Sequence, residues 1–199
     1  MLKTYKMLKD DLRFFKAPEM KIKRMTENHE ILKLTRNLYE TDLMTPGYLV
    51  AGAICSPSYL SFDFALSYYG LIPERVYTYT SASCGKRKKK IYQNPLGTFT
   101  YRDVPVSAFP YEIMLKSEEG SVFAVASPEK ALCDKLYTMK PVRSKKEMEY
   151  LLFEDLRVDK DELKKLDFSV LSELCPLYKS TSLNTFRKVI GGWNAEHSK

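Results

Sequence analysis

The sequence lacks the features that place many proteins in a membrane or an export pathway. No run of about 18 apolar residues occurs, so we expect no membrane-spanning helix. Residues 1–6 contain no apolar stretch of the kind that marks a signal peptide. Internal repeats and low-complexity linkers are also absent, which argues against repeat architectures. These absences lead us to expect a globular protein of the cytoplasm.

Cysteine and histidine are scarce, and they do not cluster. Neither histidine lies close to a cysteine, and no CxxC pair occurs among Cys55, Cys84, Cys133 and Cys175. A metal site requires clustered ligands, so we expect no metal, and we expect free thiols that lie partly in the core. A glycine-rich phosphate loop is missing as well, and we expect no cofactor.

The chain does contain enough apolar side chains for a core, together with a moderate excess of positive charge. Of its 199 residues, 44% are hydrophobic and 29% are charged. The net charge is +7, with +3 in residues 1–45, +3 in residues 46–140 and +1 in residues 141–199. The excess therefore lies in the first two-thirds of the chain and favours a polyanionic or acidic partner.

Residues 1–45 predict two helices followed by a hairpin. Residues 5–15 carry an apolar stripe at helical spacing, made of Met7, Leu8, Leu12 and Phe15. Pro18 fits the first turn of a second, basic helix whose Ile22 and Met25 face inward. Residues 31–39 alternate apolar and polar side chains, which predicts a short β-hairpin. This order is that of an abbreviated winged-helix module.

The cations of the second helix and the hairpin are the candidate DNA contacts. They would lie near phosphates if that helix enters a major groove while the hairpin follows the backbone. The alternative is an ordinary solvated surface. The candidates are Lys21, Lys23, Arg24, Lys33 and Arg36.

Residues 46–140 predict a mixed α/β core with antiparallel strands. Residues 48–54 fit either a helix or a strand, and residues 57–66 predict a helix with Ser58 or Ser61 as its N-cap. A further helix is predicted at residues 130–137, preceded by the capping sequence Ser127-Pro128-Glu129. Strands are predicted at residues 76–80, 97–102, 111–115 and 122–126.

Residues 141–199 show helical periodicity, which predicts a small bundle packed on the strand-rich core. Its four apolar stripes contain Met148, Leu151 and Leu152; Leu163 and Leu166; Val170, Leu171 and Leu174; and Leu183, Phe186 and Ile190. The expected fold class is therefore α+β. It comprises a winged-helix-like module at residues 1–45 and a larger domain at residues 46–199.

A basic turn is expected between the first two predicted strands. It could grip the phosphates of RNA or DNA, or an acidic protein surface. Equally, its lysines could keep a strand edge soluble. The turn consists of Gly85 followed by Lys86, Arg87, Lys88, Lys89 and Lys90. Strand aromatics offer a base-stacking surface in principle, although core packing is the commoner role for Tyr77, Tyr79, Phe99 and Tyr101.

Two blocks of sequence resemble signatures of the AbiEi family of type IV bacterial antitoxins. The first begins with Pro57-Ser58-Tyr59-Leu60-Ser61 and ends with Gly70-Leu71-Ile72-Pro73-Glu74. The second is Ala126-Ser127-Pro128-Glu129-Lys130-Ala131-Leu132-Cys133-Asp134. The hairpin at residues 31–39 also resembles the end of that family's winged helix. The motif residues are Pro57, Ser58, Tyr59, Ser61, Pro73, Glu74, Ser127, Pro128, Glu129, Lys130 and Asp134.

The resemblance implies a two-part antitoxin of an abortive-infection system, a form of phage defence. Its winged helix would bind operator repeats and act as a transcriptional repressor of its own operon. The protein could form a homo-oligomer on that DNA. The larger domain would counteract a nucleotidyltransferase-like toxin, and direct binding of the toxin is not implied. The alternative is an antitoxin or adaptor that does not bind DNA and acts through protein or RNA contacts.

An enzymatic alternative comes from Ser127, Glu129, Lys130 and Asp134, which place a hydroxyl, acids and a base within eight positions. Helix geometry favours a structural role instead. Lys130 and Asp134 have the i,i+4 spacing of a helical ion pair. Ser127 together with Glu129 has the pattern of a helix start. We therefore expect no catalytic residues.

Overall fold

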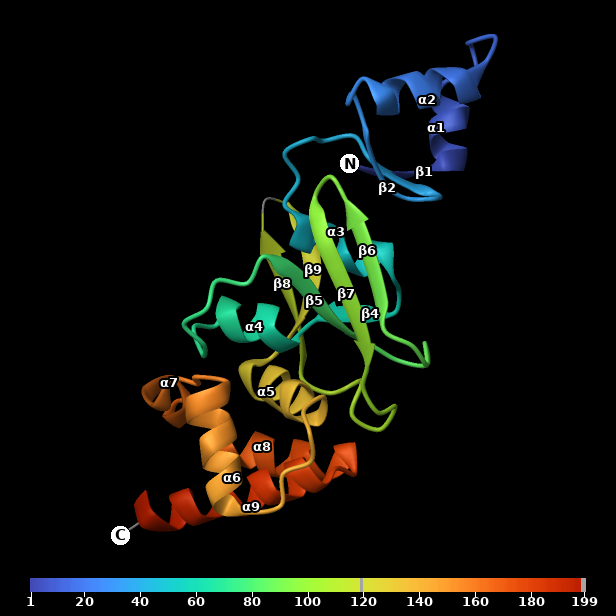
Figure 1. Cartoon of the computed structure of the whole chain (residues 1–199). Helices are drawn as coiled ribbons and strands as arrows, with labels where there is room; N and C mark the ends of the chain where they lie inside the picture. The colour runs from blue at the N-terminus through green and yellow to red at the C-terminus, as the bar shows by residue number, and fades with distance from the viewer. Residues whose placement is uncertain (119, 198–199) are drawn as a thin grey trace.

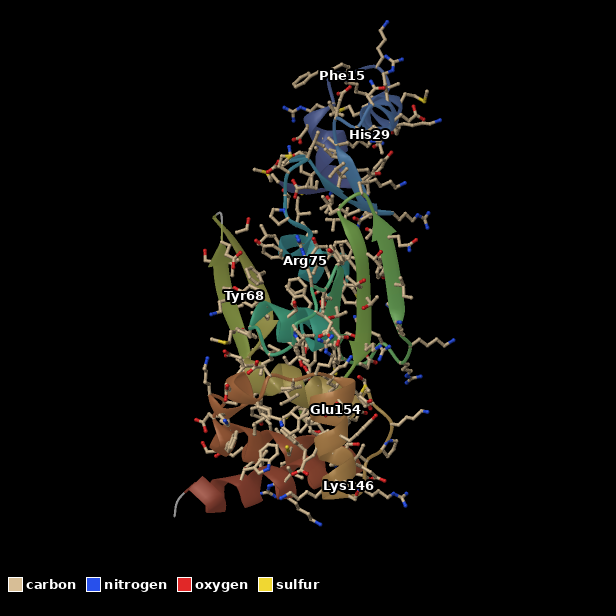
Figure 2. All side chains as sticks on the ribbon, turned by 60° about the vertical axis from the view of Figure 1, so that its left-hand side comes forward. Phe15, His29, Tyr68, Arg75, Lys146 and Glu154 are labelled. Atoms are coloured by element: carbon tan, nitrogen blue, oxygen red, sulfur yellow. The ribbon has the colours of Figure 1, made fainter. Side chains whose placement is uncertain are left out.

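The computed structural model describes residues 1–118 and 120–197 and has an α+β fold with two sheets (Figure 1). The molecule is elongated, because the N-terminal module lies at one end and the C-terminal helices at the other. Figure 2 places Phe15 and His29 near the first end and Lys146 and Glu154 near the second. Within the described residues, no helix is both long enough and apolar enough to cross a membrane.

The N-terminal module contains the predicted helices and hairpin. Its strands pair in the order β1-β3-β2, and all pairs are antiparallel. The first strand, β1, extends the hairpin to a three-stranded sheet and was not predicted. The elements are β1 (Leu2–Thr4), α1 (Tyr5–Asp11), α2 (Pro18–Glu27), β2 (Leu32–Thr35) and β3 (Leu38–Glu40).

Helix α1 is shorter than predicted, and the apolar stripe assigned to it is only partly correct. Leu8 is buried and Leu12 is half-buried, whereas Met7 and Phe15 are exposed. Phe15 lies beyond the end of the helix, so helical spacing no longer directs its side chain to the core. The small core of the module consists of Leu8, Ile22, Ile31 and Tyr39, with Met25 packed against it.

The central sheet has the strand order β6-β7-β5-β4-β9-β8. Two of its pairs, β5 with β7 and β4 with β9, are parallel, so the prediction of antiparallel strands is only partly correct. The unpredicted strand β6 forms a hairpin with β7, which brings β7 beside β5 in the same direction. The strands are β4 (Ser58–Leu60), β5 (Thr78–Ser83), β6 (Lys90–Asn94), β7 (Gly97–Asp103), β8 (Ile113–Glu118) and β9 (Ser121–Ala126).

Three helices pack with this sheet: α3 (Gly47–Ile54), α4 (Phe62–Tyr68) and α5 (Pro128–Tyr137). The prediction of one helix over residues 57–66 is wrong, because residues 58–60 pair with β5 and β9 instead. Ser61 occupies the N-cap position of α4, but its hydroxyl makes no capping bond. In α5 the predicted cap is confirmed, since the Ser127 hydroxyl accepts from the Lys130 N–H.

The C-terminal segment is helical as predicted, and α8 and α9 contact α5 of the central domain (Figure 1). The stripe residues are buried except Leu166 and Val170, which are half-buried. Residues 198 and 199 lie outside the described residues. The elements are α6 (Lys145–Tyr150), a π-helical turn η1 (Leu151–Asp155), α7 (Lys160–Lys164), α8 (Phe168–Leu174), a 3-10 turn η2 (Cys175–Tyr178) and α9 (Thr181–His197).

Candidate functional site

The two sequence blocks that resemble the antitoxin family lie side by side in the structure. Strand β4 belongs to the first block, and β9 leads into the second. These strands pair in parallel, with Leu60 opposite Val125. Helix α5 follows β9 directly, so its inward face reaches the side chains of β4. The fold therefore joins the two blocks at one buried position, Asp134.

Asp134 is the hub of a buried polar network. Its carboxylate lies 3.1 Å from the Lys130 ammonium, and both side chains are fully buried. It also accepts hydrogen bonds from the hydroxyls of Tyr59 (3.1 Å), Ser61 (2.7 Å) and Tyr178 (2.5 Å). A buried carboxylate with one cation and three donors is well compensated for its loss of water.

Lys130 is satisfied by the same network. Its ammonium donates to the carbonyl oxygen of Ala108 (2.8 Å) and to the hydroxyl of Tyr178 (2.6 Å). Burial beside the Asp134 carboxylate raises the pKa of Tyr59 and of Tyr178 far above the ordinary tyrosine value. Both phenols therefore stay protonated and act as donors. The network ties β4, α5 and η2 together.

The other two residues of the suggested catalytic group also hold structural positions. Ser127 caps α5, as predicted. The Glu129 carboxylate accepts from the backbone N–H of Asp167 at 3.0 Å, just before α8. Neither side chain joins the Lys130–Asp134 pair, which has no solvent-accessible surface. The arrangement can hold elements together, but a substrate cannot reach it in this conformation.

The remaining motif residues hold other positions in the fold. The Ser58 hydroxyl donates to the carbonyl oxygen of Cys55 at 2.5 Å, so it does not cap a helix. Glu74 pairs with Arg157 at 2.8 Å and so links the first block to the C-terminal segment. Three prolines mark turns or a helix start, namely Pro57, Pro73 and Pro128.

The candidate DNA contacts of α2 point to different sides of that helix. Successive residues are rotated by about 100°. Because Ile22 faces the core, Lys21 and Lys23 flank it and Arg24 points outward. Lys21 is half-buried, with its ammonium 5.9 Å from the centre of the Phe15 ring. Arg24 is exposed, and so is Lys23.

The hairpin cations are exposed, and one of them shares a groove with α2. Lys33 on β2 and Lys23 on α2 both line this groove, which has a volume of about 290 Å³. Glu19 and Glu27 line it too, and Glu27 lies 3.7 Å from Lys23. The groove is therefore of mixed charge. The structure brings Lys23 and Lys33 together, while Arg36 lies exposed in the turn between β2 and β3.

The basic turn between β5 and β6 is anchored at two points. The Lys86 ammonium donates to the carbonyl oxygen of Ser56 at 2.6 Å, and the backbone N–H of Arg87 donates to Asp103 at 2.6 Å. Lys88 and Lys89 are exposed. Lys90 is half-buried and is the first residue of β6, an edge strand of the sheet. This position is compatible with both interpretations of the turn, namely lysines that keep a strand edge soluble and cations that bind phosphates or an acidic protein surface.

A polar cleft of about 440 Å³ opens beside this turn. Lys89, Arg102 and Lys135 supply its positive charge, and Asp63 supplies a carboxylate. Threonines of β5 and β7 form much of the remaining polar lining. Apart from Lys89, none of these residues was a predicted site residue. The sequence signal that could have pointed to this cleft is the alternation of threonines in the predicted strands at residues 76–80 and 97–102.

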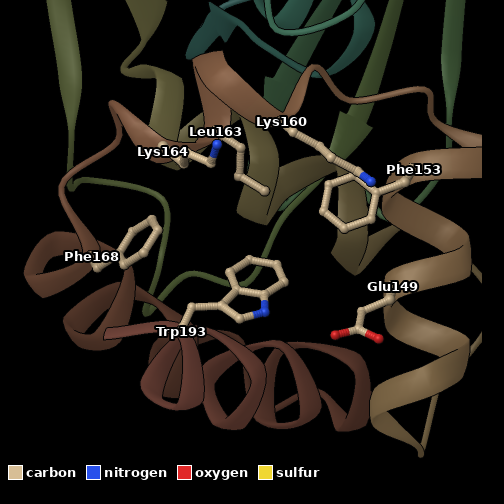
Figure 3. Close-up of a pocket in the computed structure, with 7 residues that line it drawn as sticks. All are labelled: Glu149, Phe153, Lys160, Leu163, Lys164, Phe168 and Trp193. Atoms are coloured by element: carbon tan, nitrogen blue, oxygen red, sulfur yellow. The ribbon is translucent and has the colours of Figure 1, made fainter. Parts of the chain in front are cut away.

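A second hollow, of about 360 Å³, lies between the C-terminal helices and is framed by aromatic rings (Figure 3). The Trp193 ring lies 6.1 Å from that of Phe153 and 6.5 Å from that of Phe168, measured between centroids. The Lys160 ammonium lies 4.9 Å from the centre of the Phe153 ring. The ammonium of Lys160 therefore already occupies the face of the Phe153 ring.

The strand aromatics are core residues, with one exception. Phe99 and Tyr101 are fully buried, and Tyr79 stacks on Phe99 with ring centroids 4.9 Å apart. The buried rings of Phe99 and Tyr101 cannot present a face to bases, and Tyr79 is half-buried. Tyr77 alone is exposed, and the guanidinium of Arg75 lies 5.4 Å from the centre of its ring.

The cysteines are free thiols, as predicted, and Cys55, Cys133 and Cys175 are buried. Burial also raises the pKa of the Cys133 thiol well above its ordinary value, so it remains protonated. In the described part of the chain, no group of three or more histidine, cysteine or acidic side chains could hold a metal ion.

Comparison of the chain with known protein families found no family that matches. Comparison with curated proteins found no match either.

Proposed function

We propose that this protein is an AbiEi-type antitoxin of a type IV toxin–antitoxin pair and counteracts a nucleotidyltransferase-like toxin. The observation that carries the proposal is the meeting of the two sequence blocks at Asp134. The first block supplies the donors Tyr59 and Ser61, and the second supplies the acceptor. Side chains that depend on one another for burial have a physical reason to occur together in one signature. The proposal gives both blocks a structural role and includes no catalytic step.

We propose further that the N-terminal module represses the operon of this protein by binding operator DNA. Two helices followed by a hairpin resemble an abbreviated winged helix, and in helix-turn-helix modules a helix enters the major groove. Support comes from the exposed positions of Arg24 on α2 and of Lys33 and Arg36 on the hairpin. In this proposal these cations contact phosphates of the DNA backbone.

The experiment that tests the repressor half is a titration of the full-length protein against DNA from upstream of its own operon. We expect tighter binding to this DNA than to a scrambled duplex of equal length at moderate salt, where non-specific contacts weaken. The variant Arg24→Glu/Lys33→Glu should weaken binding and lower the salt slope by about 2. The charge-matched control Arg187→Glu/Lys188→Glu changes two exposed residues of α9 and should bind normally.

The same variants separate this proposal from an antitoxin that acts only through protein or RNA contacts. The exposed basic turn favours that alternative. Each variant, together with Arg87→Glu/Lys88→Glu, is produced with the toxin from the neighbouring reading frame, and growth is scored. Failure of the wild-type protein to restore growth would remove the antitoxin half. Failure of only the turn variant, with equal binding of operator and scrambled DNA, would establish the alternative.

A further inference from the structure

The polar cleft beside the basic turn contains positive charges that the protein itself does not neutralise. In the pairing of β6 with β7, Lys90 lies opposite Tyr101 and Ile91 opposite Thr100. The next position in this register places Lys89 opposite Arg102, and both residues line the cleft. Like charges that face each other on neighbouring strands repel. Neither cation forms an ion pair with any residue within 1–118 and 120–197.

A third cation enters from α5 and is already paired. The Lys135 ammonium lies 2.5 Å from the Asp63 carboxylate, at the start of α4. The cleft therefore contains three cations and one carboxylate, which leaves a formal charge of +2. This charge sits at Lys89 and Arg102, where the walls of the cleft come from the turn and from β7.

The cleft also contains hydroxyl groups that have no partner in the described structure. β5 and β7 pair in parallel with Thr80 opposite Thr100, so Thr78, Thr80 and Thr100 share one face of the sheet. The Thr80 hydroxyl already has hydrogen-bond partners, because it donates to the carbonyl oxygen of Ser61 (2.6 Å) and accepts from the Phe64 N–H (3.0 Å). The hydroxyls of Thr78 and Thr100 make no hydrogen bond with a described residue.

We propose that this cleft binds a small phosphorylated molecule of about the size of a nucleoside monophosphate. The phosphate would lie between Lys89 and Arg102 and accept hydrogen bonds from the free threonine hydroxyls. A phosphate monoester carries a charge of about −1.5 to −2 at pH 7, which matches the +2 of the cleft. A phosphodiester within RNA carries only one negative charge per phosphate, so the charge balance favours the monoester. A volume of about 440 Å³ suits a ligand of this size.

This proposal does not rest on the antitoxin function. It is tested by calorimetric titration of the full-length protein with the four common ribonucleoside monophosphates, each compared with its nucleoside. We expect at least one monophosphate to bind and its nucleoside not to bind. Replacement by glutamine at either unpaired cation, Lys89→Gln or Arg102→Gln, should weaken binding about tenfold or more, because a charge-assisted hydrogen bond is lost.

The matched control is Lys88→Gln, which removes the same charge from the same turn at an exposed residue outside the cleft lining. Its affinity should stay within about twofold of the wild-type value, since only long-range attraction changes. Unchanged melting temperatures of the variants show that each is folded.

Four results would overturn the proposal. They are no binding of any monophosphate at millimolar concentration, equal binding of nucleoside and monophosphate, equal weakening by Lys88→Gln, and tighter binding of a short oligoribonucleotide that lacks a terminal phosphate. The last result would identify an RNA surface instead.

Discussion

The stability of this protein depends on two buried charges, those of Asp134 and Lys130. The network leaves neither charge without a partner, although both side chains have lost all contact with water. Removing one partner of such a pair leaves the other charge uncompensated, which costs more than the pair itself contributes. The two residues therefore act on stability as one unit.

We expect Lys130→Met to lower the free energy of unfolding by about 3–5 kcal/mol, because it strands the Asp134 carboxylate in the core. Adding Asp134→Asn to this variant should recover at least about 1 kcal/mol, since the buried charge is then gone while an acceptor remains for Tyr59 and Ser61. Urea denaturation followed by circular dichroism measures both values.

The matched control for this pair is Lys164→Met. Lys164 forms an exposed ion pair with Asp161 at 2.9 Å. Its removal should change stability by no more than about 0.5 kcal/mol. A double variant less stable than Lys130→Met alone would contradict the interpretation of the network as a compensated charge pair.

At the scale of single elements, α3 is positioned by a glycine at its first residue. Gly47 lies against the ring of Tyr79, and a Cβ atom built at this position would come within 2.6 Å of the Tyr79 Cζ atom. That ring cannot retreat easily, because it is stacked on the buried Phe99. The close approach of helix and sheet therefore requires the absence of a side chain at residue 47.

We expect Gly47→Ala to destabilise the protein by about 1–3 kcal/mol through overpacking. Gly52 lies on the same helix and is exposed, with open space around it. The change Gly52→Ala should stabilise the protein by about 0.5–1 kcal/mol, because alanine has the higher helix propensity. Thermal melting of the two variants compares them directly. Equal shifts in one direction would show that backbone propensity, and not the Tyr79 contact, decides at residue 47.

On the scale of the whole molecule, the N-terminal module is attached to the central domain through β2. Leu32 and Leu34 face the main core, whereas Lys33 between them is exposed. The side-chain amide of Asn94, at the end of β6, donates to the carbonyl oxygen of Leu34 at 3.4 Å. The module has only four buried core residues of its own, so a domain this small depends on that attachment.

We expect Leu34→Asp to release the module, because a carboxylate cannot remain in the apolar contact. Amide hydrogen exchange should become faster throughout α1, α2 and the β2–β3 hairpin and stay unchanged in β5 and β7. The control Lys33→Asp changes the exposed neighbour and should leave the exchange of all these elements as it is. Faster exchange in β5 and β7 as well would mean that module and sheet unfold as one unit.

Features that depend on neighbours in the chain could be predicted from the residues alone. The capping sequence at 127–129 and the apolar spacing after it predicted α5, and the alternation at 31–39 predicted the first hairpin. Helical spacing likewise predicted the C-terminal helices. These signals are local, since hydrogen bonds and caps there join residues only a few positions apart.

Which of these elements meet depends on contacts between residues far apart in the chain. Residues 58–60 form a strand because all three pair with β5 and Leu60 also pairs with β9. No local pattern in this segment, which resembles a helix in sequence, indicates that pairing. Tyr59 reaches Asp134 across 75 positions of sequence, and Lys89 faces Arg102 only because β6 pairs with β7 in one particular register. Such contacts depend on strand order and register, which are set by burial over the whole molecule.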